Sequence, residues 1–225
     1  MLDEHIIFID GEAIVVDKPS GLPVDPPRDG SLSVENHLQS LSFGFKRWPS
    51  AVHRLDRDTS GCLLLARNPK AHRRFSQLFE DGRVEKTYLA ILDGIPANEN
   101  GEVDLALAKV SSRAQGWRIV ADPKGKPARS AWRVLATVGE RSLVAFRPAT
   151  GRTHQLRVHA ASGIGIPILG DPIYGTGGGT TMLHASDLIV PREGKPPIEA
   201  HAPFPARFEA IGFTAPEPSS THSPH

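Results

Sequence analysis

The segment His53-Arg54-Leu55-Asp56-Arg57-Asp58-Thr59-Ser60-Gly61 places a carboxylate between two arginines, directly before an apolar run. Neighbouring guanidinium groups favour the ionised form of a carboxylate. An ionised Asp56 could act as a nucleophile or as a base, or it could form a structural ion pair. From the residue types alone the structural ion pair is the more common outcome, because ion-pair networks are frequent outside active sites.

A second group of polar side chains lies between Gly151 and His159. If this segment is a strand, alternation places Gln155, Arg157 and His159 on one polar surface. The opposite face would then carry Arg152, His154, Leu156 and Val158. A half-exposed strand with hydrogen-bonding residues would show the same pattern, so the segment alone does not define a chemistry.

A bound metal ion is the competing chemistry. The chain contains suitable ligand types, namely His53, Asp56, Asp58, His154, His159, His184 and Asp187. Their spacing argues against a metal site, because His154 and His159 are five residues apart and would face opposite sides of a strand. Neither His-x-His nor His-Glu-x-x-His occurs in the chain. We therefore predict no metal site.

The elements that must position these residues are mostly strands. Short β-branched runs on either side of Asp10-Gly11 predict a hairpin. Further extended segments are expected at 62–66, 87–92, 103–107, 131–138, 143–146 and 154–158. One short helix is expected near 34–41, and a second follows the cap Asn68-Pro69 with its apolar stripe at Ala71, Phe75, Leu78 and Phe79. The glycine-rich segment 175–181 lacks the order of a phosphate-binding loop and predicts a flexible loop.

Composition limits the location and the partners of the protein. The chain has 225 residues, of which 39% are apolar, and no run approaches the roughly 18 apolar residues of a membrane helix. The N-terminus lacks the pattern of a secretion signal, and Cys62 is the only cysteine. These features predict a cytoplasmic protein without a disulfide or a membrane contact.

Net charge is only +1, but positive charge is concentrated between Lys109 and Arg133, where Asp122 is the one acidic residue. A solvated face and a phosphate-binding face explain this segment equally well. Phosphate contacts need cations rather than a particular motif, so the segment that includes Lys124 and Lys126 is the expected RNA-facing surface if the protein binds RNA.

Taken together, these segments strongly resemble the Rlu branch of the RNA pseudouridine synthases. The segment 53–61 is similar to the catalytic motif of that family. The other family motifs are matched, in order, by Val16 to Leu22, Glu85 to Ala90 with Gly94, Gly151 to His159, Gly170 to Gly175, and Leu183 to Ala185. The resemblance spans roughly residues 6–213. Ser130 and Trp132 stand where the family more usually has threonine and tyrosine, at strand positions that we expect to be structural.

The resemblance implies an α/β fold of the α+β type, with a mixed, largely antiparallel sheet, flanking helices and an active-site cleft. We expect one catalytic domain at residues 1–213 and a disordered tail at residues 214–225. The first strand begins near residue 5, so an N-terminal S4 RNA-binding domain is not expected, and the catalytic domain itself must hold the RNA. A monomer that needs neither a metal ion nor an organic cofactor is expected.

Transferred by resemblance, the site consists of Asp56 as catalytic aspartate, Tyr88 as active-site tyrosine and Arg157 as the arginine paired with the aspartate. Arg54 matches the arginine that enters the RNA stack where the uridine leaves it. The predicted substrate-binding residues are His53, Arg54, Thr59, Lys124, Lys126, Arg152 and Gln155. Asp58 occupies a variable position of the motif and receives no catalytic role.

The expected reaction is the isomerisation of specific uridines to pseudouridine in structured ribosomal RNA or transfer RNA, on a base flipped out of its helix. The sequence leaves open whether Asp56 attacks the sugar, stabilises it or assists proton removal. Tyr88 could pack against the base or, more boldly, remove its C5 proton. Two other functions compete: a non-catalytic RNA-binding protein that kept the fold, and a metal-dependent phosphoesterase.

Overall fold

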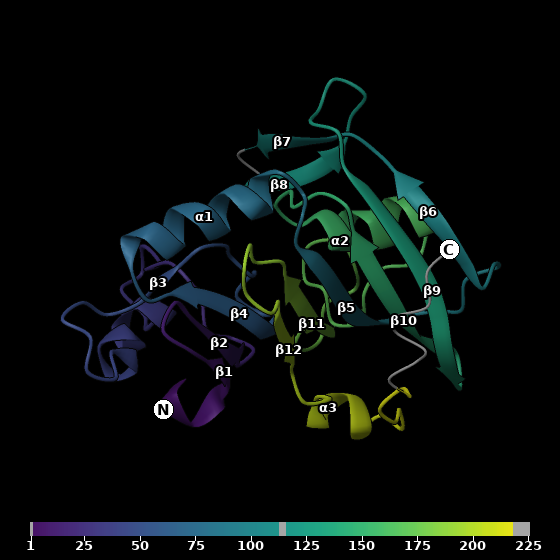
Figure 1. Cartoon of the computed structure of the whole chain (residues 1–225). Coiled ribbons are helices and arrows are strands. Elements are labelled where there is room, and N and C mark those ends of the chain that lie inside the picture. The colour runs from purple at the N-terminus through teal and green to yellow at the C-terminus, as the bar shows by residue number, and fades with distance from the viewer. Residues whose placement is uncertain (1, 113–115, 218–225) are drawn as a thin grey trace. The chain divides into compact units, whose positions relative to one another are not determined.

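Two compact units make up the chain in the computed structural model, which describes residues 2–112 and 116–217 (Figure 1). Unit 1 comprises Met1–Lys86 and His184–Pro203, and unit 2 comprises Thr87–Leu183 and Phe204–His225. One catalytic domain at residues 1–213 remains a prediction, because a single domain can contain two compact units. The disorder expected of the tail concerns mainly residues 218–225, which lie outside the described residues.

A mixed sheet forms the centre of unit 1. Its strands are β1 (Ile6–Ile9), β2 (Ala13–Lys18), β3 (Ser50–Ala51), β4 (Ser60–Ala66), β11 (Leu183–Val190) and β12 (Ile198–His201). The order is β1-β2-β4-β11, with β3 paired to β4 and β12 paired to β11. The pairing of β4 with β11 is parallel, and the other pairings described in this unit are antiparallel. All seven residues of β4 are buried, which explains why the strand reads as a continuous apolar run.

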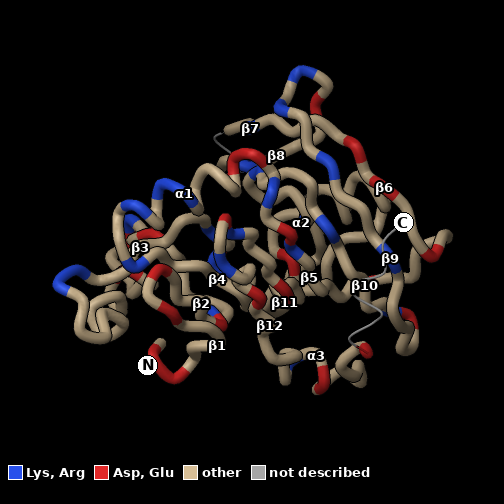
Figure 2. The backbone as a smooth tube through the Cα atoms, in the orientation of Figure 1, with Lys and Arg blue, Asp and Glu red and all other residues tan. Residues whose placement is uncertain are grey.

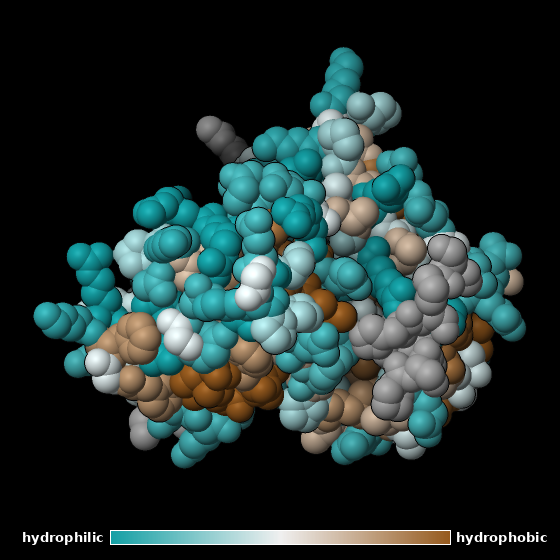
Figure 3. All heavy atoms as spheres, in the orientation of Figure 1, coloured by the Kyte–Doolittle hydropathy of each residue, from teal (hydrophilic) through white to brown (hydrophobic). Residues whose placement is uncertain are grey.

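The predicted hairpin of β1 and β2 is confirmed. Asp10 closes its turn, because Oδ1 accepts hydrogen bonds from the backbone N–H groups of Glu12 (2.8 Å) and Ala13 (2.9 Å). Figure 3 shows hydrophobic side chains gathered over β1 and β2 on the viewed face. The strand β1 stands at the edge of the sheet order, where Ile9 is 45% exposed.

The helices of unit 1 are η1 (Leu2–His5), the 3₁₀ helix η2 (Val34–Leu41) and α1 (Pro69–Glu80). The predicted cap of α1 is confirmed, because Asn68 Oδ1 accepts the backbone N–H of Ala71 at 2.9 Å. The apolar stripe is also confirmed: Ala71, Phe75 and Leu78 are buried, and the helix packs against β4. This arrangement fixes α1 to the strand that follows the Asp56 segment.

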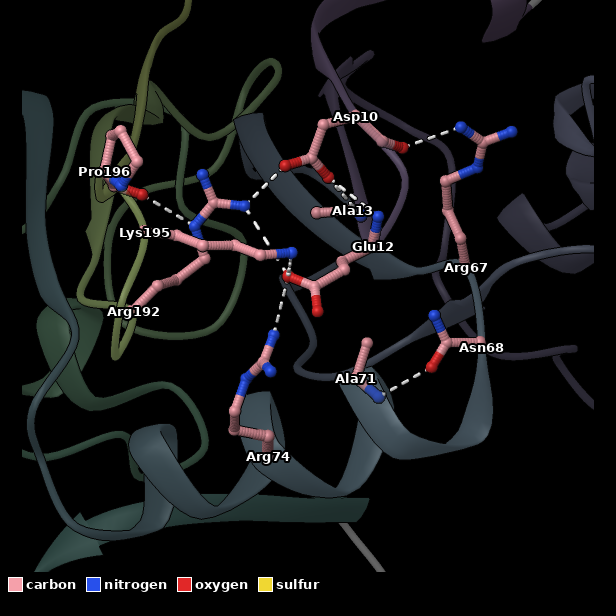
Figure 4. A network of polar contacts seen from close by, with 10 residues as sticks. All are labelled: Asp10, Glu12, Ala13, Arg67, Asn68, Ala71, Arg74, Arg192, Lys195 and Pro196. Atoms are coloured by element: carbon pink, nitrogen blue, oxygen red, sulfur yellow. Dashed lines mark hydrogen bonds and ion pairs between the residues drawn. The ribbon is translucent and has the colours of Figure 1, made fainter.

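An ion-pair network joins the β1–β2 turn to α1 and to the segment between β11 and β12 (Figure 4). Glu12 binds Arg74 of α1 at 2.9 Å and Lys195 at 3.1 Å. Arg192 binds Asp10 and donates to the carbonyl oxygen of Pro196 at 2.7 Å. Hydrogen bonding from Arg74 is the main reason that the pKa of Glu12 lies below its ordinary value, although burial opposes it.

An antiparallel sheet forms the centre of unit 2. Its strands are, in sheet order, β5 (Glu85–Leu92), β10 (Arg141–Pro148), β9 (Arg129–Val138) and β6 (Asn100–Asp104). A separate hairpin consists of β7 (Leu107–Ser112) and β8 (Gly116–Ala121). The helical elements are α2 (Gln155–Val158), the π-helical η3 (His159–Ile164) and α3 (Ala206–Glu209).

The unit 2 sheet has an apolar cluster on each face, because side chains alternate along its strands. Ala90, Leu92, Val144 and Phe146 pack with Leu156 and Ala160 of the α2–η3 segment. Leu89, Ile91, Leu143 and Ala145 pack with Phe208 and Phe213. The strands predicted at 87–92, 131–138 and 143–146 are thus confirmed, whereas the one predicted at 103–107 is divided between β6 and β7.

The strand predicted at 154–158 is wrong, because residues 155–158 form the helix α2. His154 adopts a left-handed conformation with a φ of 53° and starts the helix. The i, i+4 spacing of a helix then brings Leu156 and Ala160 together in the apolar cluster, which a strand would not do. The polar residues of this segment therefore do not share the one strand face that the sequence suggested.

Candidate active site

Asp56 lies in unit 1, in the loop between β3 and β4. The loop turns tightly, because the backbone carbonyl oxygen of Asp56 accepts the N–H of Thr59 at 3.1 Å. The side chain of Leu55 is buried and anchors the loop beneath the half-buried Asp56. The backbone on both sides of Asp56 is therefore held in place.

Lys18 fixes this loop from the end of β2. Its side chain is completely buried, and Nζ donates to the carbonyl oxygens of Pro19 (2.8 Å), Leu22 (2.7 Å) and Arg57 (3.0 Å). Hydrogen bonds from a charged donor are roughly twice as strong as neutral ones. Lys18 therefore ties the segment 18–22 to the residue that follows Asp56.

Two further contacts strengthen the same junction. The hydroxyl group of Ser20 donates to the carbonyl oxygen of Asp58 at 2.6 Å, and the N–H of Gly21 donates to that of Arg57 at 2.9 Å. The two sequence motifs 16–22 and 53–61 are thus one hydrogen-bonded structure. The resemblance pointed to the first motif, but nothing in its letters indicated that its lysine positions the Asp56 loop.

The end of the loop requires glycine at position 61. Gly61 has a φ of 104°, and a Cβ atom there would lie 2.2 Å from the carbonyl oxygen of Ala185 on β11. The preceding residues are inaccessible, since Thr59 is 3% and Ser60 is 4% exposed. Thr59 was predicted to bind substrate, and this remains a prediction for a side chain that the structure buries.

His53 has a structural environment. Its Nε2 accepts the backbone N–H of Leu64 at 2.9 Å, and its ring stacks on Phe79 with centroids 4.4 Å apart. Burial, together with the positive charge of Lys86, lowers the pKa of His53 from 6.5 to about 3. The ring is therefore neutral at ordinary pH. These contacts account for the histidine without RNA, and its predicted contact with substrate stays a prediction.

The two arginines beside Asp56 have other partners in the described structure. Arg54 pairs with Asp25 at 3.0 Å and Arg57 pairs with Asp29 at 3.5 Å. The expectation that these guanidinium groups favour the ionised form of the Asp56 carboxylate stays a prediction. The side chain of Arg54 is 71% exposed, and so open an ion pair contributes at most about 1 kcal/mol. Such a pair can be exchanged for another contact at little cost.

Tyr88 and Arg157 belong to unit 2. Tyr88 lies on β5 opposite Phe146 of β10 and is half-buried against the cluster that contains Leu156. Asp56 belongs to unit 1, so the assembly of these three residues into one site remains a prediction of the family resemblance.

Arg157 forms a buried two-point ion pair with Asp171. Nε and Nη2 lie 2.6 Å and 2.8 Å from the two carboxylate oxygens, and the side chains are 7% and 0% exposed. Asp171 also accepts the N–H groups of Ile173 (2.9 Å) and Tyr174 (3.1 Å). Burial alone would raise the pKa of Asp171, but these bonds and the charge of Arg157 hold it below its ordinary value. The sequence analysis placed Asp171 in a family motif but gave it no role. It did not predict the ion pair between Asp171 and Arg157.

Gln155 is a buried junction between α2, β9 and the loop before α2. Its Nε2 donates to the carbonyl oxygen of Arg129 (3.0 Å) and to Ser130 Oγ (2.9 Å), while Oε1 accepts Thr150 Oγ1 (2.7 Å) and Arg152 N (3.0 Å). An amide side chain offers two donors and one acceptor oxygen, and all of these are used. The predicted role of Gln155 in substrate binding stays a prediction beside this structural one.

Three histidines that could have been metal ligands each bind a hydroxyl group. His154 Nδ1 lies 2.9 Å from Tyr174 Oη, His159 Nδ1 lies 3.0 Å from Ser130 Oγ, and His184 Nδ1 lies 2.8 Å from Ser60 Oγ. Among residues 2–112 and 116–217, no three His, Cys, Asp or Glu side chains form a group that could hold a metal ion. None of the helices in these ranges is long and apolar enough to span a membrane.

The predicted RNA-facing segment includes parts of the paired strands β7 and β8 and the loop before β9, and its residues 113–115 lie outside the described residues. Trp117 of β8 is 46% exposed, and Lys109 Nζ lies 4.9 Å from its ring centroid. Lys124 and Lys126 are exposed in the loop between β8 and β9, which carries blue segments in Figure 2. Arg152 is exposed nearby and donates from Nε to the carbonyl oxygen of Pro127 at 3.2 Å. Unit 2 thus brings these cations to one part of its surface.

Comparison with known proteins identifies the class. The RNA pseudouridylate synthase family matches residues 12–162. The chain therefore belongs to the RNA pseudouridylate synthase family, and it is an isomerase that acts on RNA. The family inferred from the ordered motifs is confirmed.

Individual proteins of this family show how far the similarity extends along the chain. An uncharacterized RNA pseudouridine synthase of Zymomonas mobilis subsp. mobilis is 60% identical over 217 residues, which cover 95% of this chain and 99% of the relative. The ribosomal large subunit pseudouridine synthase D of the same bacterium is 40% identical over 178 residues, covering 76% of this chain but only 56% of that protein. Human RNA Pseudouridylate Synthase Domain Containing 4 has the same fold, with a TM-score of 0.80 over 96% of both chains at 24% identity. The predicted fold class is confirmed.

Proposed function

We propose that this enzyme isomerises uridine to pseudouridine in the RNA of the large ribosomal subunit, with Asp56 as the catalytic carboxylate. The observation that carries the proposal is the loop of Asp56, which Lys18 and Ser20 fix through backbone atoms of Arg57 and Asp58. The ribosomal substrate is supported by the similarity to synthase D of Zymomonas mobilis. Transfer RNA remains the alternative substrate.

The reaction exchanges one bond to the sugar for another. The C1′–N1 bond breaks with its electron pair on N1, the base rotates, and C5 joins C1′. The C5 proton then leaves and N1 gains a proton, so no oxidant, reductant or second substrate is consumed. Bond cleavage makes C1′ electron-poor, and the negative charge of Asp56 stabilises that centre in the flipped-base site.

In this proposal Arg157 orients the carboxylate of Asp56 and keeps it ionised. A guanidinium carries five N–H donors, so the ion pair with Asp171 leaves it able to serve a second carboxylate. Asp171 and the ring of Tyr174, whose centroid lies 5.2 Å from the guanidinium carbon above it, fix the plane of Arg157. A fixed arginine can hold Asp56 ionised and oriented without reorganising during the reaction.

Tyr88 packs against the flipped uracil, and Arg54 enters the space that the uridine leaves. A phenol has an unperturbed pKa of about 10, so packing fits Tyr88 better than proton removal. Extrusion of a paired base costs a few kcal/mol, and stacking by Arg54 offsets part of it. The weak pair of Arg54 with Asp25 is consistent with this exchange.

The RNA backbone is held by the cations around the β7–β8 hairpin. These are Lys109, Lys124, Lys126, Arg129 and Arg152, with Trp117 as an exposed aromatic surface among them. Contacts to phosphate set affinity rather than the choice of uridine.

The absence of any second cysteine beside Cys62 supports a location in a reducing cytoplasm, and we propose a monomer.

The decisive experiment is Asp56→Asn, measured as tritium release from large-subunit ribosomal RNA that contains 5-tritiated uridine. We expect release to fall by about 1,000-fold or more, with RNA affinity changed less than about threefold. Asp58→Asn is the matched control, since it removes a carboxylate from the same loop and should leave release unchanged.

Two results would contradict the proposal. If the wild-type enzyme releases no tritium from ribosomal or transfer RNA but binds both, the protein is an RNA-binding module. If a chelator abolishes an RNA-cleaving activity, the metal-dependent phosphoesterase gains support. Matched preparations of ribosomal and transfer RNA also decide which RNA is the substrate.

A further inference from the structure

A pocket in unit 1 lies between the loop that precedes β3 and the start of α1. It encloses about 640 Å³, within the range of pockets that bind small organic ligands. Its lining includes Lys46, Arg47, Trp48, His72 and Arg73, and it includes neither Asp56 nor any other carboxylate. Figure 2 shows blue segments in the loop before β3 and at the start of α1.

The cations of this pocket are not used to stabilise the fold. Lys46, Arg47 and Arg73 are exposed, and none of them forms an ion pair within the described chain. The adjacent Arg74 shows the contrast, because it is half-buried and bound to Glu12. Three unpaired cations around a concave surface favour a polyanionic ligand.

Trp48 adds an aromatic surface to the pocket, since its side chain is 60% exposed. A large aromatic residue left this exposed contributes little to the core. Beside cations it offers a stacking platform for a nucleobase, and every base has a face that can use it. An acidic peptide would use the cations but would gain much less from the indole ring.

The loop that carries Trp48 is anchored to the protein. The buried Arg67 donates from Nη2 to the carbonyl oxygens of Ser42 and Phe43, both at 3.3 Å, and its guanidinium carbon lies 4.0 Å above the ring of Phe45. The capped first turn of α1 forms the opposite side. The pocket is therefore preorganised, which lowers the entropy cost of binding.

We propose that this pocket binds a nucleotide of the RNA substrate at a position away from the target uridine. The base stacks on Trp48, and the neighbouring phosphates lie among Lys46, Arg47 and Arg73. The proposal deepens the proposed function, since it assigns unit 1 a second RNA contact that sets affinity rather than chemistry.

The test measures binding of fluorescein-labelled decauridylate by fluorescence anisotropy at several salt concentrations. We expect Trp48→Ala to weaken binding by about fivefold or more, which is the lower bound for loss of one stacked base. Trp48→Phe keeps an aromatic face and should retain most of the affinity. Thermal unfolding of each variant controls for folding, which an exposed side chain should not affect.

The charge contribution is tested with Arg73→Ala against Lys70→Ala. Both residues are exposed cations in the first turns of α1, but Lys70 does not line the pocket. Arg73→Ala should weaken binding more and should lower the slope of log affinity against log salt by about 1. Equal effects of the two variants would show a diffuse charge effect and would overturn the pocket.

The outcomes separate this proposal from the proposed function. If the wild type isomerises RNA but Trp48→Ala binds decauridylate as tightly as the wild type, only the nucleotide pocket is wrong. If Trp48→Ala loses affinity but the wild type isomerises no RNA, only the catalytic assignment is wrong. A 4-thiouridine cross-link from the RNA to the peptide containing Trp48 would support the pocket independently.

Discussion

The loop of Asp56 in unit 1 and the helix of Arg157 in unit 2 are held in opposite ways. Backbone atoms hold the loop, since Lys18 and Ser20 bond to the carbonyl oxygens of Arg57 and Asp58. Side chains hold the helix, since Arg157 bonds to Asp171, and Gln155 and His159 share Ser130.

The difference concerns which substitutions each region tolerates. A loop fixed through its carbonyl oxygens keeps its shape when its own variable side chains change, so Asp58 can vary while Asp56 stays in place. A helix fixed through its polar side chains loses structure with each of them. We therefore expect changes at Gln155, Arg157 or His159 to lower stability and activity together. Changes at Lys18 should lower activity by more than the lost stability explains.

The largest effect is expected for Asp171→Ala. Removal of this carboxylate takes the two-point ion pair away from the buried guanidinium of Arg157, which costs about 3–5 kcal/mol of unfolding free energy. Urea unfolding measures the loss, and tritium release should disappear with it. The double variant Arg157→Met, Asp171→Leu should regain much of the stability but no activity. A single variant as stable as the wild type would show that the ion pair does not hold the helix.

The next effect is expected for Lys18→Met. Loss of the charged donor leaves three carbonyl oxygens without Nζ, and the unfolding free energy should fall by about 2–3 kcal/mol. At a temperature where the variant is folded, tritium release should still fall at least tenfold, with RNA affinity unchanged. Lys70→Met, on the exposed surface of α1, is the control. A folded Lys18→Met enzyme with normal release would mean that Lys18 does not position Asp56.

Lys18 and Arg157 also show what the sequence could and could not predict. Local patterns were sufficient for the hairpin around Asp10, for the cap at Asn68 and for the buried strand β4, because each depends on neighbouring residues. The partners of Lys18 and Arg157 depend on contacts 39 and 14 residues away in the chain. Spacing carries no signal for such contacts.

The helix α2 was missed for a related reason. Four helical residues are too few to show a helical period, and the alternation of polar and apolar residues from His154 to Val158 favours a strand. The cluster beneath Leu156 decides the outcome, because tertiary packing overrides a short local pattern. The ordered motifs still identified the residues, although not their geometry.

A smaller effect is expected from pH, through His53 in the Asp56 loop. The folded protein keeps this ring neutral down to a pKa of about 3, whereas the unfolded chain binds a proton near pH 6.5. Stability from this group is therefore present above pH 6.5 and is lost as the pH falls below it, by about 2 kcal/mol between pH 7 and pH 5. His53→Gln keeps an acceptor for Leu64 but does not titrate. Urea unfolding at pH 7 and at pH 5 measures how much unfolding free energy each protein loses on acidification. The variant should lose about 2 kcal/mol less than the wild type. Equal losses would show that His53 does not cause the pH dependence.

The smallest effect compares one hydroxyl group from each region. Ser130 is completely buried, and its Oγ serves both Gln155 and His159, so Ser130→Ala should cost about 1–3 kcal/mol. Ser20 is half-buried and makes one bond, so Ser20→Ala should cost about 0.5–1 kcal/mol. Ser130→Thr keeps the hydroxyl group and should lose less stability than the alanine variant. If Ser20→Ala proved the more damaging, the contrast between a loop held by its backbone and a helix held by its side chains would be wrong. The two bonds to the carbonyl oxygen of Arg57, from Lys18 and Gly21, should instead maintain the loop without Ser20, and tritium release should stay near the wild-type value.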